Sequence, residues 1–170
     1  MPSIANSELL CNSVLTLVSP ELYKIGLDVV NWLKHSLVHS MGHPNVSLWP
    51  SVYSGIQIIV NRETPAHRDP GAAPPAYDML VSTGTHTVSD FYLADIKTTL
   101  SYAPGTVVAL CGRVLRHEVM TWEGGERICI AHYMKDNVHE RLMLPRPGWV
   151  HRDKYCGMME QSFHERCCKH

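Results

Sequence analysis

The sequence contains no hydrophobic stretch that could cross a membrane, because no segment approaches ~18 uninterrupted apolar residues. Its opening residues, MPSIANSELLCNSVLTLV, also lack the basic start, apolar run and small-residue cleavage site of a secretory signal. From these two absences we expect a protein that is not secreted and has no membrane partner. An intracellular protein, nuclear or cytoplasmic, is therefore predicted.

The sequence also has no excess of charge of either sign, with a formal net charge of −1 and a pI of about 6.8. This balance excludes a global positive field of the kind that binds DNA through counterion release. A nucleic-acid substrate would need a local basic patch. Nothing in the sequence indicates an obligate protein partner.

Six cysteines are present, an even number, but without a secretory signal they are interpreted as thiols rather than as a disulfide framework. They are Cys11, Cys111, Cys129, Cys156, Cys167 and Cys168. Eleven histidines are many for a chain of this length and favour metal chemistry.

The chain has 170 residues, of which 45% are apolar, so it is long enough for one compact domain and too short for two ordinary ones. We expect a single domain over residues 1–170. Residues 1–45 would form a helical support layer, residues 51–135 a β core, and residues 145–170 a C-terminal tail.

Two helices are expected in the first forty residues. Apolar residues crowd positions 9–18 and predict a first helix with these side chains on one side. Ser19-Pro20-Glu21 then supplies an N-cap, a first-turn proline and an acid near a positive helix end. A second apolar repeat follows over residues 22–37, and Gly42 and Pro44 are expected to stop it.

After residue 51 the pattern changes to short β-rich runs separated by tight turns. The runs are VYSGIQIIV, YDMLVST, THTVSDFYLAD, KTTLSYA, TVVALC, VLRHEVMTW and RICIAHYM. Many short strands after a helical layer predict a mainly β fold, a double-sheet jelly roll with N-terminal helices packed on one sheet.

The tail from Pro145 onward is expected to be loosely packed. Its thiols and imidazoles in CGMMEQSFHERCCKH could bind zinc, but their spacing matches no standard zinc knuckle. The tripeptide His151-Arg152-Asp153 has no following strand or distal histidine and is interpreted as a surface turn.

The tripeptide His67-Arg68-Asp69, unlike His151-Arg152-Asp153, is followed by predicted strands and by a distal histidine. In an extended segment residues i and i+2 project to the same side, so His67 and Asp69 can reach one ion. His117 follows two predicted strands and shares an inward face with Leu115 and Val119. A buried histidine needs a partner, and a metal would provide one. The alternative is a turn ion pair beside an ordinary core histidine.

Ten residues after His117, Arg127 opens the apolar run RICIAHYM. A guanidinium at this position must be paired, and a carboxylate bound in bidentate fashion is its best partner. Two histidines and one carboxylate leave three positions open on an ion, which is the arrangement of non-haem Fe(II) oxygenases.

His-x-Asp, a distal histidine in YAPGTVVALCGRVLRHEV and an arginine ten residues later resemble the Fe(II)/2-oxoglutarate dioxygenase superfamily and its double-stranded β-helix fold. More narrowly, HRD with that second stretch is similar to the fungal branch of the TET/JBP oxygenases. The resemblance implies that His67, Asp69 and His117 bind iron and act in catalysis, and that Arg127 binds 2-oxoglutarate. The cofactors implied are Fe(II), 2-oxoglutarate and O2, with ascorbate as a reductant.

The chain departs from the family at two places. Cys129 stands where many members have a serine that also binds the cosubstrate, and Pro70-Gly71-Ala72-Ala73 replaces the stretch in which animal TET enzymes carry a base-reading asparagine.

The substrate implied is the methyl group of 5-methylcytosine or of a related methylated base in nucleic acid. Arg62, Arg68 and Arg116, with Arg113, are candidates for contacts to phosphates. Two alternatives stay open: a dioxygenase for a small molecule or protein side chain, and a non-catalytic metal-binding jelly roll.

Overall fold

Two helices open the fold, as predicted. The computed structural model describes residues 2–41 and 48–167. Helix α1 (Pro2–Val18) and helix α2 (Pro20–Met41) pack against each other on either side of a sharp break at Ser19. The backbone of Ser19 bridges the break, since its N–H donates to the carbonyl of Leu15 and its carbonyl accepts from the N–H of Tyr23. The predicted stop at Gly42 and Pro44 lies outside the described residues.

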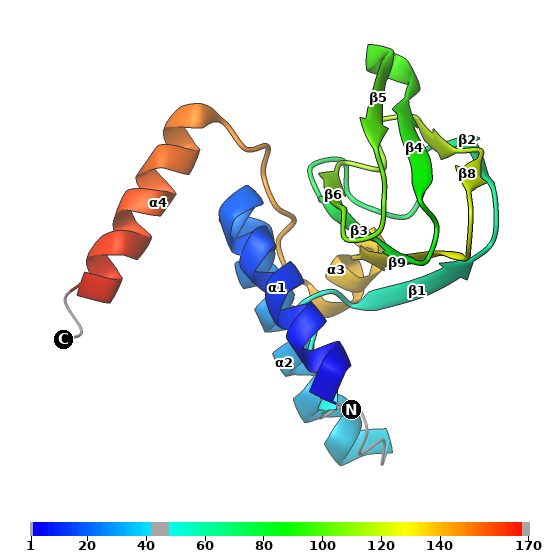
Figure 1. Ribbon diagram of the computed structural model, residues 1–170. Helices are drawn as coiled ribbons and strands as arrows, with labels where there is room; N and C mark the ends of the chain where they lie inside the picture. The colour runs from blue at the N-terminus through cyan, green and yellow to red at the C-terminus, as the bar shows by residue number, and fades with distance from the viewer. Residues whose placement is uncertain (1, 42–47, 168–170) are drawn as a thin grey trace.

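Nine strands follow in the part of the chain that the structure describes, together with a 3-10 turn at Ala94–Ile96. The strands are β1 (Gly55–Val60), β2 (Thr64–His67), β3 (Asp78–Gly84), β4 (Val88–Leu93), β5 (Thr98–Ser101), β6 (Val107–Leu110), β7 (His117–Val119), β8 (Trp122–Glu123) and β9 (Arg127–Tyr133). They form two antiparallel sheets, β1-β9-β3-β6 and β2-β7-β4-β5, and β8 pairs with β4. The two sheets enclose a common interior (Figure 1), so the predicted double-stranded β-helix is confirmed.

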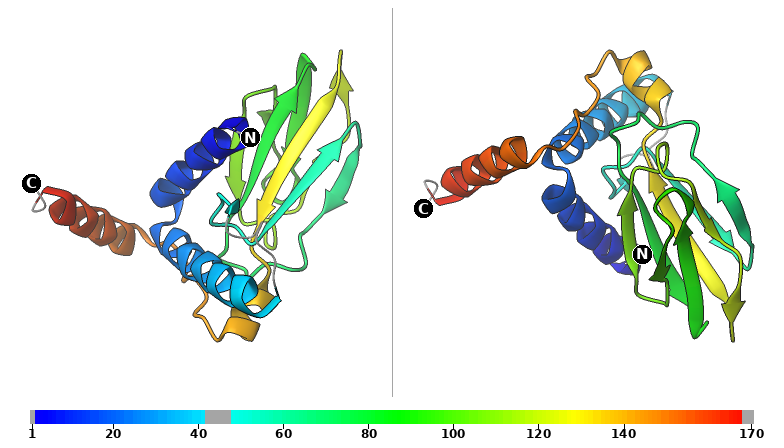
Figure 2. Two further views of the ribbon diagram at one scale, coloured as in Figure 1. Left: turned by 90° about the horizontal axis from the view of Figure 1, so that it is seen from below. Right: turned by 90° about the horizontal axis from the view of Figure 1, so that it is seen from above.

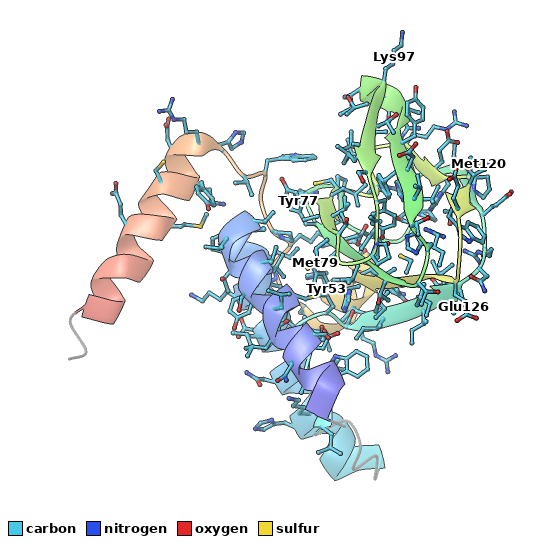
Figure 3. All side chains as sticks on the ribbon, viewed as in Figure 1. Tyr53, Tyr77, Met79, Lys97, Met120 and Glu126 are labelled. Carbon is cyan, nitrogen blue, oxygen red and sulfur yellow. The ribbon has the colours of Figure 1, made fainter. Side chains whose placement is uncertain are left out.

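Helices α1 and α2 cover one side of the first sheet (Figure 2). Their core contains Leu15, Leu22 and Val29 packed against Met79 of β3. Met79 and Tyr53 mark this junction in Figure 3. A buried polar contact joins the same layers, because Glu8 of α1 contacts Nε2 of His132 on β9 at 2.8 Å.

A second apolar cluster fills the space between the two sheets. It contains Phe91, Leu93, Tyr102, Val108, Leu110 and Val119. Because side chains on a strand alternate between faces, β3 directs Met79 to the helices and Leu80 to this interior. A cavity lined in part by Leu80, Phe91 and Val119 opens into the same interior.

The outer surface of α1 differs from the expected pattern. Leu9, Leu10 and Leu17 are exposed, whereas Cys11 and Leu15 face the core beside Glu8. Apolar side chains lie on both the exposed and the buried faces of α1, so their spacing in the sequence did not identify the buried face.

The C-terminal segments are more helical than the sequence pattern indicated. Helix α3 (Asp136–Leu142) follows β9 directly, and helix α4 (Arg152–Cys167) occupies the tail that was expected to be loosely packed. The predicted surface turn at residues 151–153 is instead the exposed start of α4. Helix α4 projects away from the rest of the chain (Figures 1 and 2), and Lys154 contacts Glu21 of α2 at 2.7 Å.

Among the described helices, none combines the length and the apolar character needed to cross a membrane. The four described cysteines, Cys11, Cys111, Cys129 and Cys156, are free thiols. The side chains of His164, Cys167, Cys168 and His170 lie outside the described part, so zinc binding by the tail stays a hypothesis.

Candidate metal centre and its cavity

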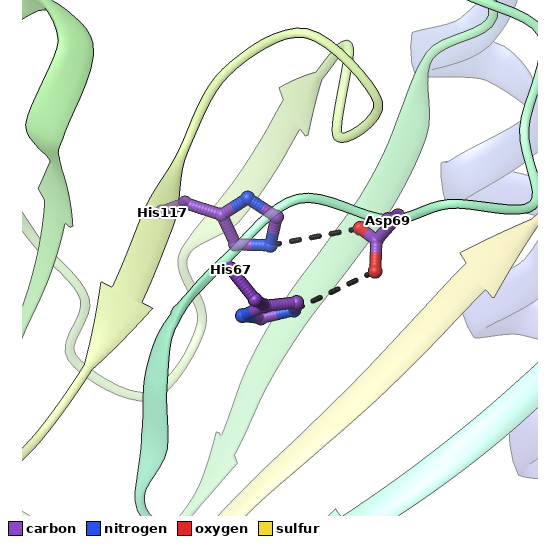
Figure 4. A group of neighbouring side chains, drawn as sticks. All are labelled: His67, Asp69 and His117. Atoms are coloured by element: carbon purple, nitrogen blue, oxygen red, sulfur yellow. Dashed lines mark ion pairs between the residues drawn. The ribbon is translucent and has the colours of Figure 1, made fainter.

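Two neighbouring strands bring the three predicted ligands together. Strand β2 ends at His67, and strand β7 begins at His117, which pairs directly with His67 in the antiparallel register. Asp69 lies just beyond the end of β2, where its backbone N–H donates to the carbonyl of Gly112. One ligand atom from each residue lies within 4.8 Å of the other two. Figure 4 shows the three side chains converging.

The three groups meet without a hydrogen bond between them. Nε2 of His67 lies 3.5 Å from Oδ1 of Asp69, and Nε2 of His117 lies 3.6 Å from Oδ2. These separations exceed those of charge-assisted hydrogen bonds. Nδ1 of His67 lies 2.9 Å from the carbonyl of Pro65, and Nδ1 of His117 lies 2.9 Å from that of Leu115.

Because a carbonyl oxygen only accepts, each Nδ1 carries the proton and each Nε2 presents a lone pair. Two lone pairs and a carboxylate therefore face one point, where a cation would satisfy all three. Backbone carbonyls that bind the remote imidazole nitrogen are the usual orienting partners of metal-binding histidines. The residues present thus fit a divalent metal ion.

His117 is further fixed by its surroundings. Its ring stacks on Phe91, with ring centroids 5.5 Å apart and planes 10° from parallel. Burial lowers the pKa of His117 and the nearby His67 adds to the lowering, while the Leu115 hydrogen bond and Asp69 act in the opposite direction. The net lowering favours the neutral imidazole that a metal ion requires.

The carboxylate of Asp69 packs closely against the backbone of Gly112. A Cβ at this position would collide with Oδ2 of Asp69 and also with Oδ2 of Asp78. The two carboxylates are therefore neighbours across Gly112. Burial raises the pKa of Asp78 to about 8, and the charge of Asp69 adds to the rise.

We expect Gly112→Ala to lower the metal affinity by about 10- to 100-fold, as for loss of an orienting partner, because the added methyl group displaces the Asp69 carboxylate. Titration with Mn(II) measures this affinity. Gly71→Ala is the matched control, since its Cβ would touch only Lys135 at ordinary contact distances of 3.7–3.8 Å. An affinity unchanged in Gly112→Ala would show that Asp69 is not held as described.

Arg127 lies in the same cavity as the three ligands and is 1% exposed. Its Nη1 donates to the carbonyl of Arg62 at 2.9 Å, and its guanidinium lies 5.8 Å from the ring centroid of Tyr102. Its Nε is buried and has no hydrogen-bond partner among the described residues. A buried cation with a free donor fits an anionic ligand such as a carboxylate.

Cys129 lies two residues further along β9, on the same face as Arg127. Its thiol is buried and lies 3.4 Å from the hydroxyl of Tyr102. Burial raises the pKa of Cys129, although Tyr102 and Arg127 act to lower it. The position predicted for cosubstrate binding therefore carries a neutral, weakly polar thiol.

A cavity of about 310 Å³ joins these groups. Apolar side chains of both sheets form much of its wall, including Ile59, Leu80, Phe91, Val119 and Ala131. Arg62 and Lys135 also line it, and both are exposed. Neither has an acidic ion-pair partner within the described ranges.

The other predicted substrate arginines are placed differently. Arg68 and Arg116 do not line the cavity. Arg68 is paired with Asp95 at 2.8 Å, and Arg113 donates to the carbonyl of Pro70 at 2.8 Å. Of the three arginines predicted to contact substrate, the structure brings only Arg62 to the cavity.

Two charged residues of the cavity were not predicted from the sequence. Asp78 lies in the predicted strand YDMLVST and was not singled out. Its side chain projects to the same face as that of Leu80, two residues later, and an acidic residue on an inward face is the signal that could have identified it. Lys135 reaches the cavity through a bridge between its backbone and Ala72, a tertiary contact that carries no sequence signal.

Comparison with known proteins identifies a family and several similar solved structures. Residues 3–136 match the Tet_JBP family, described as the oxygenase domain of the 2OGFeDO superfamily. The chain is similar to NgTET1, solved in complex with 5mC DNA, with a TM-score of 0.60 and 17% identity. The similarity covers 92% of this chain but 56% of that one, so the chain spans about half the length of this relative.

Two cupins show weaker likeness. An RmlC-like cupin from Desulfovibrio desulfuricans has 12% identity and a TM-score of 0.31, covering 45% of this chain and 71% of that one. A Cupin 2 barrel protein from Salinispora arenicola has 14% identity and a TM-score of 0.33, covering 52% and 82%. No curated protein matches the sequence.

Proposed function

The chain belongs to the Tet_JBP family of oxygenase domains in the 2OGFeDO superfamily, and from this membership we propose that it is an Fe(II)- and 2-oxoglutarate-dependent dioxygenase that hydroxylates a C–H bond. The observation that carries the proposal is the convergence of two Nε2 lone pairs and the Asp69 carboxylate on one point. These groups repel one another unless a cation lies between them.

In the proposed enzyme, His67, Asp69 and His117 hold the iron. Ferrous iron with 2-oxoglutarate and O2 supplies the oxidising power for hydroxylation, and ascorbate keeps the iron reduced. The carbonyls of Pro65 and Leu115 hold the protons of the two Nδ1 atoms, so the imidazoles stay aimed and neutral.

Arg127 binds the distal carboxylate of 2-oxoglutarate, with its unpaired Nε as a donor. The ring of Tyr102 covers the guanidinium, and the apolar walls around Phe91, Val119 and Leu80 exclude water. The thiol of Cys129 is a weaker donor than the serine common in the superfamily. Arg127 therefore carries most of the cosubstrate binding in this chain.

As the substrate we propose a methylated base of nucleic acid, with the methyl group of 5-methylcytosine as the first candidate. A cavity of about 310 Å³ has room for a single extruded base. Arg62 and Lys135 lie exposed at that cavity and suit the phosphates on either side of such a base. They provide the local basic patch that the near-neutral net charge makes necessary.

The experiment that tests this function supplies Fe(II), ascorbate and 2-oxoglutarate and measures succinate. We expect an oligonucleotide with 5-methylcytosine to stimulate succinate release well above an unmethylated oligonucleotide of the same sequence. Mass spectrometry should then show one added oxygen on the methylated base.

Other outcomes separate the alternatives. Stimulation by methylated peptides or small molecules, without stimulation by any oligonucleotide, would contradict the nucleic-acid substrate and leave the dioxygenase. Tight metal binding without succinate, whatever substrate is offered, would favour the non-catalytic metal-binding jelly roll.

A further inference from the structure

Asp78, the first residue of β3, is a buried carboxyl group without a hydrogen-bond partner in the part of the chain that the structure describes. Its side chain is 3% exposed and lines the cavity, and neither carboxyl oxygen has a hydrogen bond among the described residues. The backbone N–H of Gly112 lies near the carboxyl and acts to lower its pKa, against the larger rise caused by burial. An unsatisfied buried carboxyl is costly, and in native proteins it usually marks an absent ligand or a functional group.

Asp78 lies far from the proposed cosubstrate clamp. Arg127 pairs with Gly84 at the other end of β3, and the strand from Asp78 to Gly84 spans about 20 Å at the rise of a strand. A five-carbon acid held by Arg127 is much shorter than this distance. Across Gly112, in contrast, the Asp78 carboxyl is a neighbour of the metal ligand Asp69. Asp78 therefore borders the metal centre on the side away from Arg127.

We propose that Asp78 determines which substrate is accepted, by accepting hydrogen bonds from an exocyclic amino group of the base that enters the cavity. This inference rests on the proposed function and names the class of base, one with an amino group rather than a keto group. In the described lining of the cavity, Asp69 and Asp78 are the only carboxylates. With Asp69 engaged by the metal, whose positive charge favours the ionised form of the neighbouring Asp78, the Asp78 carboxylate is the strongest acceptor left for a substrate.

The charges at the cavity favour a base over a cationic side chain. A protein substrate with an amino group, such as a lysine, would also suit an isolated carboxyl. Arg62 and Lys135, both exposed and without an acidic partner in the described ranges, would repel such a cation. They would attract the phosphates that flank a base. The segment after Asp69 is apolar and buried at Ala72 and Ala73, and provides no competing polar side chain.

5-Methylcytosine and thymine provide a matched pair of ligands. Both carry a methyl group at C5, and they differ at C4, where one has an amino group and the other a keto oxygen. The keto oxygen would place an acceptor against the acceptor oxygens of Asp78. A site built around a buried polar group rejects a ligand that fails to pair with it.

The test measures binding to protein loaded with Mn(II) and N-oxalylglycine, which prevents turnover. Two single-stranded oligonucleotides, identical except for one central 5-methylcytosine or thymine, are titrated by fluorescence anisotropy. We expect wild type to bind the 5-methylcytosine strand about 10- to 100-fold more tightly, the range of one hydrogen bond to a charged group. In Asp78→Asn, whose amide both donates and accepts, the ratio should fall to near one.

Asp90→Asn, an exposed change on β4, should keep the wild-type ratio. Because the ratio compares two ligands on the same metal-loaded protein, a change in metal affinity cancels. Equal binding of the two strands by wild type, or a preference that survives in Asp78→Asn, would overturn the role of Asp78 while leaving the proposed function. If neither strand binds but a methylated peptide does, the nucleic-acid substrate fails as well.

Discussion

Asp69→Ala should abolish metal binding and turnover while leaving the fold in place. The carboxylate of Asp69 is the only charged ligand of the centre, and it lies 3.5 and 3.6 Å from the two Nε2 atoms. Changes to orienting partners of metal ligands cost about 10- to 100-fold, so loss of the charged ligand itself should cost more than ~100-fold. Titration with Mn(II) and succinate release with Fe(II) measure the two losses.

The chain contains its own control for this substitution. Asp153 ends the second His-Arg-Asp tripeptide, is exposed and lies in the first turn of α4. Asp153→Ala should keep both metal binding and turnover. Near-normal metal affinity in Asp69→Ala would contradict the ligand assignment, and a loss in both variants would point to a general effect on the fold.

Arg127→Met should raise the KM for 2-oxoglutarate by about 100-fold or more, because hydrogen bonds to a charged group contribute about 1.5–3 kcal/mol each. Methionine keeps most of the buried volume and removes the donors. Turnover at saturating 2-oxoglutarate should fall less than the affinity does. Succinate release measured against 2-oxoglutarate concentration separates the two effects.

Because Arg127 is fully enclosed between Arg62, Tyr102 and Trp122, thermal unfolding should be measured alongside. Arg127→Lys, which keeps the charge but loses the planar fork, should show a smaller rise in KM. Arg152→Met, an exposed change at the start of α4, serves as the control. An unchanged KM in a folded Arg127→Met protein would contradict the clamp.

The sequence predicted the convergence of His67, Asp69 and His117 because its signals are local. His67 and Asp69 are two residues apart on an extended segment, and the inward phase of His117 could be counted from Leu115 and Val119. What it could not show is the direct pairing of His67 with His117 across β2 and β7. That register depends on how the whole second sheet closes.

Buried acidic residues whose partners lie far away in the sequence were not predicted. Glu8 is buried on an apolar helix only because His132 contacts it from 124 residues away. Burial alone would raise the pKa of Glu8, but its hydrogen bonds to His132 and Ser51 lower it. The position of Asp78 beside Gly112 and Asp69 likewise depends on the fold and could not be predicted from the sequence.

Helix α4 was missed for a different reason. Its residues, RDKYCGMMEQSFHERC, show no regular apolar stripe, so periodicity gave no signal. The exposed arginines show the same limit, since whether Arg62 or Arg68 reaches the cavity depends on neighbours such as Asp95.

The central claim is that His67, Asp69 and His117 hold one metal ion. Crystals grown anaerobically with Mn(II) and 2-oxoglutarate test it directly through anomalous diffraction. We predict one anomalous peak in coordination contact with both Nε2 atoms and the Asp69 carboxylate, and 2-oxoglutarate extending from it toward Arg127. A peak only at the cysteine- and histidine-rich tail, or no peak between the two imidazoles, would contradict the account.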